Sequence, residues 1–150
     1  SDGKGFSFTA KMAIDSDGVG SSHGDVYHQN QTSMRLANGS SLNADVTPYL
    51  VLPPQVAKRF GAKPGDLAIV TYKGKSSPAI FGDVGPRAKL GEGSMKLAAN
   101  LGIHNDPNRG GASGGVKYQV FPGSGRRVQW THANTTTAGL MQELRRQNLA

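Results

Sequence analysis

The feature that most constrains this chain is that its apolar runs are short and are separated by single glycines. There are 21 glycines among 150 residues, about twice the usual share. They stand singly between apolar segments such as 67–72 and 116–121, whose length suits strands better than helices. The pattern therefore predicts many tight turns that join short strands.

The individual segments support a mainly β interpretation. Residues 5–14 alternate between apolar and polar side chains, which predicts a half-buried strand. Further strands are expected at 32–36, 47–52, 67–72, 79–81, 116–121 and 126–130. Short helices are expected at 55–60, at 94–101, and from a cap at Asn134 or Thr135 to about Gln147. A small β-barrel with two or three short helices fits these elements best, and a double-psi barrel is one form of it that we consider.

Length and composition limit the other possibilities. A chain of 150 residues fits one domain and can bury a core without cross-links. Cysteine is absent, so neither a disulfide framework nor a thiolate metal site can form. No apolar run approaches the length that crosses a bilayer. We therefore expect one domain over residues 1–150 that acts as a monomer, away from membranes and without a cofactor.

The net charge is +7 and the isoelectric point is near 9.9. Such a charge can serve solubility, or it can attract an anionic partner such as nucleic acid, teichoic acid or cell wall. The basic residues are dispersed, and their densest group is Arg126, Arg127, Arg145 and Arg146. Neither an aromatic RNA-binding motif nor a long basic run accompanies them, so we expect no nucleic-acid partner.

Two acidic residues stand out in the middle of the chain. Asp83 follows the apolar run 79–81, and Glu92 lies between two glycines ahead of the expected helix at 94–101. Of ten acidic residues only two are glutamates, which makes a glutamate in this setting unusual. Acids on loops beside rigid elements are typical of catalytic groups. Taken alone, the same residues also fit an ordinary turn and a helix start with Ser94 as its N-cap.

These residues, with four further motifs, resemble glycoside hydrolase family 75, the endo-chitosanases. The string G-D-x-G, followed by G-E-x-S with Asp83 and Glu92 nine positions apart, resembles the catalytic segment of that family. The other motifs are MAIDSDG (12–18), QTS (31–33), PYLVLP (48–53) and YQVFPGS (118–124). Each motif is common, but their shared order is specific. The resemblance covers roughly residues 11–124 and leaves 125–150 as a C-terminal extension with a helix.

The resemblance implies an endo-acting hydrolase that cleaves β-1,4-linked, glucosamine-containing polymers of the chitosan type with inversion at the anomeric carbon. Asp83 and Glu92 would be the catalytic pair, and a polysaccharide would be the partner. The residues expected to bind substrate are Asp15, Asp17, Gln31 and Thr32. The sequence begins Ser1-Asp2-Gly3, which is compatible with a processed end, so we expect a secreted or exported protein.

The string Asp15-Ser16-Asp17-Gly18 also begins like a calcium-binding loop. The later ligands of such a loop, including the glutamate at its twelfth position, are missing. A turn built on aspartate side chains is the better explanation. We therefore expect no metal ion.

The local sequence predicts a different charge for each catalytic acid. Asp83 follows an apolar strand end, which disfavours its charged form. Glu92 precedes a helix start, where N–H groups and the helix dipole favour a carboxylate. Glycosidic cleavage needs one protonated and one ionised carboxyl group at the same pH. We therefore expect Asp83 to be the general acid and Glu92 the general base.

Two other functions stay open. Chitosan is a polycation, which a chain of charge +7 repels at long range unless the acids form a local acidic cleft. Peptidoglycan has the same backbone with anionic decorations, so a cell-wall glycosidase or a toxin domain is the first alternative. A non-catalytic carbohydrate-binding barrel is the second. Such modules usually expose aromatic side chains, whereas most of the one Trp, four Tyr and five Phe lie in apolar strands.

Overall fold

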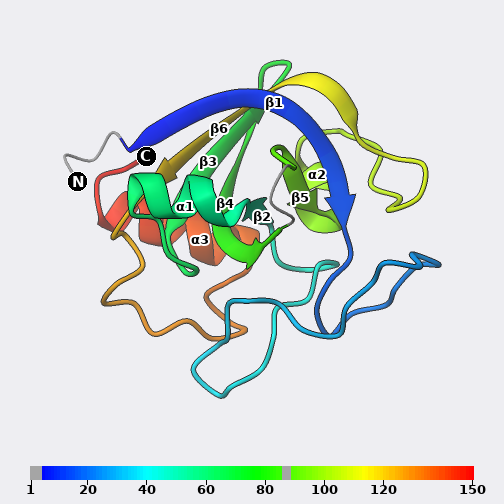
Figure 1. Ribbon diagram of the computed structural model, residues 1–150. Coiled ribbons are helices and arrows are strands. Elements are labelled where there is room, and N and C mark those ends of the chain that lie inside the picture. Colours follow the sequence, from blue (N-terminus) through cyan, green and yellow to red (C-terminus); the bar gives the residue numbers. More distant parts are fainter. Residues whose placement is uncertain (1–4, 86–88) are drawn as a thin grey trace.

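The computed structural model describes residues 5–85 and 89–150 and shows a closed barrel of six strands with three short helices (Figure 1). The strands are β1 (Phe6–Asp15), β2 (Tyr49–Leu52), β3 (Leu67–Tyr72), β4 (Lys75–Val84), β5 (Glu92–Ser94) and β6 (Ala112–Phe121). The helices are α1 (Pro54–Phe60), α2 (Met95–Asn100) and α3 (Thr137–Arg146). The prediction of a mainly β chain folded as a small barrel is confirmed. The expected processed end at Ser1–Gly3, and residues 86–88, lie outside the described residues.

The order of strands around the barrel is β1-β5-β2-β4-β3-β6. β1 pairs in parallel with β5, and β2 pairs in parallel with β4, while the remaining neighbours are antiparallel. Parallel strands cannot be joined by a hairpin, and β2 is connected to its parallel partner β4 through α1 and β3. The connection from β1 to β2, residues 16–48, extends beyond the end of β1 (Figure 1). The ends of β1 and β2 lie beside the start of β5, and the end of β4 lies beside the end of β2.

The barrel is filled by large side chains from every part of the sequence. Tyr49, Phe81 and Tyr118 are fully buried, each on a different strand. In β1 the alternation predicted from the sequence is present, because Met12 and Ile14 are buried while the residues between them are more exposed. Burial of apolar area of this kind is the main stabilising term in a domain without cross-links.

Several predicted elements have the expected position. The helix predicted at 55–60 is α1, which begins with Pro54 at its first position and ends at Gly61 in the left-handed conformation (φ 73°). The helix predicted at 94–101 is α2, and the Ser94 side chain caps it by accepting from the Leu97 N–H. Among the helices of the described ranges, none is long and apolar enough to cross a membrane.

Other predicted elements are wrong. Residues 32–36 form no strand, and only an isolated bridge joins Arg35 to Ser41. Residues 126–130 form no strand either: residues 122–127 are in turns, in which the Arg126 N–H donates to the Gly123 carbonyl and the Val128 N–H to the Gly125 carbonyl, and residues 128–130 have no regular structure. The last helix begins after a cap at Thr136, not at Asn134 or Thr135. The strand expected at 116–121 is longer than predicted, because β6 begins at Ala112.

Candidate active site

A β-bulge in β4 determines where Asp83 points. β4 does not stop before Asp83, as expected, but continues to Val84. Phe81 pairs with Leu50 and Asp83 pairs with Val51, so Gly82 is an extra residue without a partner in β2. Without the bulge, Asp83 would share the core-facing side of Phe81, because side chains alternate along a strand. The bulge places Asp83 on the opposite face, and bulges beside functional sites often re-aim a side chain in this way.

Gly82 is required at the bulge because no larger residue fits. A Cβ atom on Gly82 would lie 2.6 Å from Leu42 Cδ1 and 2.8 Å from Tyr49 Cβ. Gly93, which follows Glu92, is equally restricted, since a Cβ there would lie 2.8 Å from Met12 Cε. The glycines beside the two acids therefore permit close packing of the barrel wall behind the site.

Glu92 and Asp83 lie in one row across the barrel wall. Val51 of β2 pairs with Glu92 of β5 on one side and with Asp83 of β4 on the other. Ala13 of β1 continues the row, because it pairs with Glu92. Residues paired across neighbouring strands project to the same face, and all four line one cleft. The two predicted catalytic acids are thus separated by a single strand.

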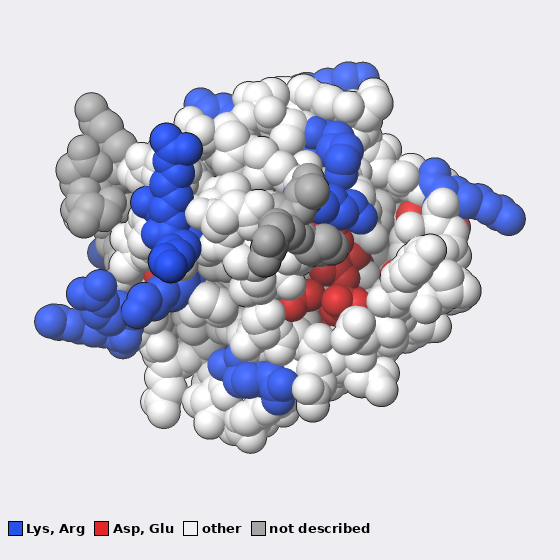
Figure 2. Space-filling model, viewed as in Figure 1, with Lys and Arg blue, Asp and Glu red and all other residues white. Residues whose placement is uncertain are grey.

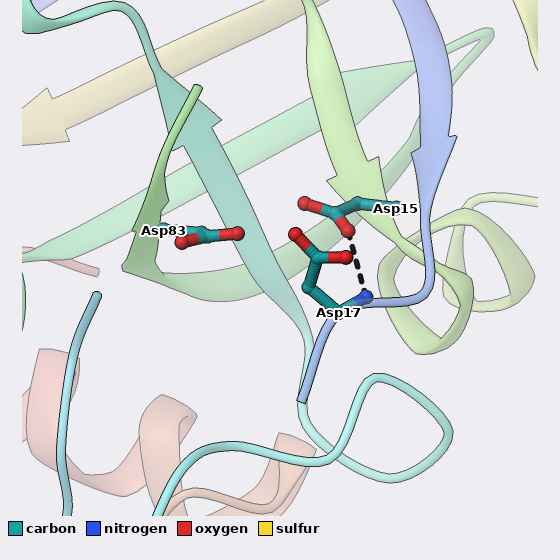
Figure 3. A group of neighbouring side chains, drawn as sticks. All are labelled: Asp15, Asp17 and Asp83. Carbon is teal, nitrogen blue, oxygen red and sulfur yellow. Dashed lines mark hydrogen bonds between the residues drawn. The ribbon is translucent and has the colours of Figure 1, made fainter. Parts of the chain in front are cut away.

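Asp15 and Asp17 join this pair at the end of β1. The Asp17 N–H donates to Asp15 Oδ1 at 2.8 Å, which is the aspartate turn expected from the sequence. In Figure 3 the Asp15, Asp17 and Asp83 side chains point toward one another. One oxygen from each lies within 4.8 Å of the others. Carboxylates this close can be held by shared protons or by a cation.

All six residues predicted for the site line the same cleft, which has a volume of about 950 Å³. They are Asp15, Asp17, Gln31, Thr32, Asp83 and Glu92. Figure 2 shows the acidic side chains gathered in a hollow, with Lys and Arg side chains spread over the surface around it. The chain therefore has a local acidic cleft on a basic surface.

Asp83 is surrounded by donors, contrary to the expectation of an apolar setting. Its Oδ1 accepts from the Ser33 N–H at 2.9 Å, from the Ser33 hydroxyl at 2.9 Å and from the Val84 N–H at 3.1 Å. Donors of this kind favour the charged carboxylate. Sequence reasoning did not single out Ser33, although it is the last residue of the QTS motif. The Asp83 side chain is therefore held in place by hydrogen bonds rather than surrounded by apolar groups.

Glu92 differs from Asp83 in its hydrogen bonds. It is 9% exposed, and its Oε1 atom is buried and has no hydrogen-bond partner among residues 5–85 and 89–150. Burial raises the pKa of Glu92, and the charge of Asp83 adds to that shift, while Lys89 and Lys11 oppose it. The helix does not favour a charge on Glu92, because Glu92 starts β5 and Ser94 takes the capping position. The expectation that the sequence after Glu92 favours its charged form is therefore not supported, because its pKa is raised.

The neighbouring acids also hold protons more strongly than usual. Burial and the charge of Asp17 raise the pKa of Asp15 to about 8. Burial raises the pKa of Asp17 to about 7, and a hydrogen bond shared with the Asp83 side chain adds to the shift, against the Gln29 N–H that donates to Asp17. Asp17 therefore exchanges its proton near neutral pH, where an ordinary aspartate is fully ionised.

Gln31 and Thr32 differ in what they offer to a ligand. The Thr32 hydroxyl donates to the Met34 carbonyl and accepts from the Leu42 N–H, and the residue is buried. Its hydroxyl therefore fixes the loop. Gln31 is exposed, and its Oε1 accepts from Arg35 Nη2 at 2.9 Å. Of these two residues, Gln31 is the one whose side-chain N–H₂ group is exposed and able to donate to a ligand.

Comparison with known proteins agrees with the motifs. The sequence profile of the family described as fungal chitosanase of glycosyl hydrolase group 75 matches residues 12–147, which confirms the resemblance and extends it past Ser124. Endo-chitosanase C of Aspergillus oryzae is 32% identical over 129 residues, which cover 82% of this chain and 33% of that protein. The chain thus spans about a third of the length of this relative. Among solved structures, the Streptomyces papain inhibitor aligns with a TM-score of 0.49 and 17% identity, over 77% of this chain and 94% of that one.

Proposed function

Because the chain belongs to glycosyl hydrolase group 75, we propose that it is an endo-acting glycoside hydrolase of β-1,4-linked, glucosamine-containing polymers of the chitosan type. The observation that carries the proposal is the row across β5, β2 and β4, which sets Glu92 and Asp83 on either side of Val51 in one cleft. Hydrolysis of a glycosidic bond by this route needs two carboxyl groups that flank the bond.

In this proposal Glu92 is the general acid and Asp83 is the general base. Burial raises the pKa of Glu92, so its proton is available for the glycosidic oxygen of the leaving sugar. Asp83 carries three donors on one oxygen, which favours the charge that a base needs. Asp83 removes a proton from water as the water attacks the anomeric carbon from the face opposite to the leaving group.

The spacing of the two acids supports inversion. They are separated by two inter-strand intervals of about 4.8 Å, which puts their Cα atoms about 10 Å apart. An inverting pair needs its carboxyl groups roughly 6.5–9.5 Å apart, so that the water fits between base and sugar, and a retaining pair needs about 5 Å. A direct contact between the two carboxyl groups is not needed for the proposed reaction.

The acidic cleft supports a cationic polymer as substrate. Asp15 and Asp17 lie beside Asp83, and a protonated amine of glucosamine would favour the ionised form of these carboxyl groups and pair with it. The basic surface around the cleft, and Lys89 and Arg35 at its wall, favour a second candidate. That candidate is a glycosidase of peptidoglycan, as in a cell-wall enzyme or toxin domain, because peptidoglycan carries anionic decorations.

The experiment is a substrate panel with variants of both acids. The chain, Asp83→Asn and Glu92→Gln are incubated with chitosan and with purified peptidoglycan, and the release of reducing ends is measured. We expect cleavage of chitosan, and a loss of about 10³-fold in rate in each variant. The matched control is Glu143→Gln, which changes the other glutamate of the chain, on α3.

Each outcome of the panel has one interpretation. If both variants keep the rate of the unmodified chain, this pair is not catalytic. If only peptidoglycan is cleaved, the second candidate replaces chitosan. If neither polymer is cleaved but one is bound, the chain is a non-catalytic carbohydrate-binding barrel.

A further inference from the structure

Two apolar side chains at the cleft are held almost fully in solvent. Val26 and Tyr27 are each 84% exposed, more than any other large apolar residue in the described ranges. Both line the same cleft as the acids, and the proposed reaction uses neither. An exposed aromatic side chain beside a binding cleft gains free energy when a ligand covers it.

The turn that presents Tyr27 is fixed by the buried end of β1. Asp25 Oδ1 accepts from the Tyr27 N–H at 2.9 Å, and Asp25 Oδ2 accepts from the Ser16 hydroxyl at 2.8 Å. The same hydroxyl lies 2.9 Å from His28 Nδ1. Ser16 is fully buried between Asp15 and Asp17 in the sequence. Ser16 therefore connects the turn that carries Tyr27 to Asp15 and Asp17.

Further hydrogen bonds hold the turn from both sides. The Gln29 N–H donates to Asp17 Oδ1, and the Gly18 N–H donates to the Gln29 carbonyl. On the other side, Asn108 Nδ2 donates to the Gly24 carbonyl. Pro107, next to Asn108, lines the cleft. An aromatic residue on a turn restrained in this way loses little conformational entropy when a ligand binds.

We propose that Tyr27 is a stacking platform for one sugar ring of the polymer, with Val26 extending its apolar surface. This inference rests on the proposed function. A pyranose ring has an apolar C–H face, and a tyrosine has an apolar ring with a polar end, so the ring face covers the sugar while the hydroxyl stays in water. Contact of this type does not depend on the charge of the sugar, and it complements the carboxylates, which recognise charge.

The first experiment separates binding from chemistry. Tyr27→Ala and Tyr27→Phe are compared for KM and kcat on soluble chitosan. We expect KM to rise about tenfold in Tyr27→Ala, which corresponds to ~1.4 kcal/mol, with kcat within about twofold, because the platform binds ground state and transition state equally. Tyr27→Phe keeps the apolar face and restores KM. The control is Phe60→Ala, which removes another exposed aromatic ring, outside this cleft.

The second experiment detects contact between the side chain at position 27 and the sugar by fluorescence. Tyr27→Trp is placed in the Glu92→Gln variant, and tryptophan fluorescence is followed as a glucosamine oligosaccharide is added. The native Trp130 is buried, so the exposed new indole reports the change, and Phe60→Trp in the same variant is the control. We expect a saturable shift in emission for Tyr27→Trp alone.

The two proposals can fail separately. An unchanged KM in Tyr27→Ala, or an unchanged emission in Tyr27→Trp at saturating oligosaccharide, overturns the platform even when the unmodified chain cleaves chitosan. The titration uses an inactive variant, so it decides the platform even when no polymer is cleaved. Absence of cleavage by the unmodified chain overturns the proposed function instead.

Discussion

Asp66 and the cleft acids are buried to similar degrees, but their oxygens have different partners. Asp66, just before β3, is 3% exposed, and both of its oxygens are used: Oδ2 accepts from the Lys63 and Gly123 N–H groups, and Oδ1 accepts from the Gly125 N–H. Glu92 is 9% exposed and has a buried oxygen without a partner in the described part of the chain. Buried polar groups are normally satisfied. The comparison therefore separates an acid whose hydrogen bonds hold the fold from the acid that we propose to be the proton donor.

The two regions also differ in what their acids connect. Asp66 joins the turn at 63–66 to the turn that follows β6, so it connects two segments that are far apart in the sequence. The acids of the cleft instead lie close to one another. Burial raises the pKa values of Asp15, Asp17 and Glu92, and the charges of the neighbouring acids raise them further. Clustering of like charges stabilises no fold, but it supplies carboxyl groups in different protonation states.

The largest effect is expected on stability at Asp66. Asp66→Asn should lower the free energy of unfolding by about 3 kcal/mol, because its amide nitrogen cannot accept from the N–H donors on both oxygens. Asp83→Asn should stay within about 1 kcal/mol of the unmodified chain, since the three donors share Oδ1, which asparagine keeps. Urea denaturation measures both. Equal losses of unfolding free energy in the two variants would show that Asp66 and Asp83 do not differ in their contribution to stability.

A second effect is expected in the pH dependence of stability. The pKa of Asp15 is raised from 3.8 to about 8, so the folded chain keeps a proton that the unfolded chain releases across this range. Deprotonation therefore favours the unfolded state increasingly as pH rises from about 4 to about 8. Asp15→Asn has no such proton and can still accept from the Asp17 N–H.

The measurement is thermal unfolding of both chains from about pH 3 to about pH 9. We expect Asp15→Asn to match the unmodified chain at the acidic end and to exceed it at pH 8 by at least about 1.4 kcal/mol, the equivalent of one pKa unit. A constant difference at every pH would show that the Asp15 proton is not held by the fold. Asp66→Asn serves as the comparison from the other region.

The smallest effects on stability and KM are expected at Gln31 and Thr32, two neighbours in the QTS motif. Thr32→Val should cost about 1–2 kcal/mol of stability, because the hydroxyl makes two buried hydrogen bonds, and KM should not change. Gln31→Ala should leave stability within about 0.5 kcal/mol and raise KM about threefold, equivalent to ~0.7 kcal/mol. Urea denaturation and steady-state kinetics give both values. The reverse pattern would assign substrate binding to Thr32.

The barrel could be predicted because its signals are local. Short apolar runs, single glycines, the proline that starts α1 and the Ser94 cap of α2 are each visible in the sequence. The strand predicted at 126–130 does not form: the Trp130 side chain donates to the Gly65 carbonyl, and the residues before Val128 are in turns. The structure of residues 126–130 therefore depends on contacts with distant segments, which a local sequence pattern does not reveal.

The six residues proposed from the sequence do line one cleft, but the surroundings of the two central acids could not be predicted. The expected protonation used only sequence neighbours, namely an apolar run before Asp83 and a helix after Glu92. The bulge at Gly82 turns Asp83 away from that apolar run, and the Ser33 donors come from a segment fifty residues away. Tyr27 is not among the residues predicted for the site, because exposure beside a cleft has no signature in a single sequence.

The stereochemistry of the first product tests the central claim most directly, namely that Glu92 and Asp83 act across one strand with a water between them. Chitosan oligosaccharides are cleaved in the NMR tube, and the anomeric protons of the new reducing end are followed before mutarotation. The account predicts that the α-anomer appears first, because a water held by Asp83 attacks the β-linked carbon from the opposite face. First appearance of the β-anomer would mean a covalent intermediate and a closer pair of carboxyl groups, which contradicts the account.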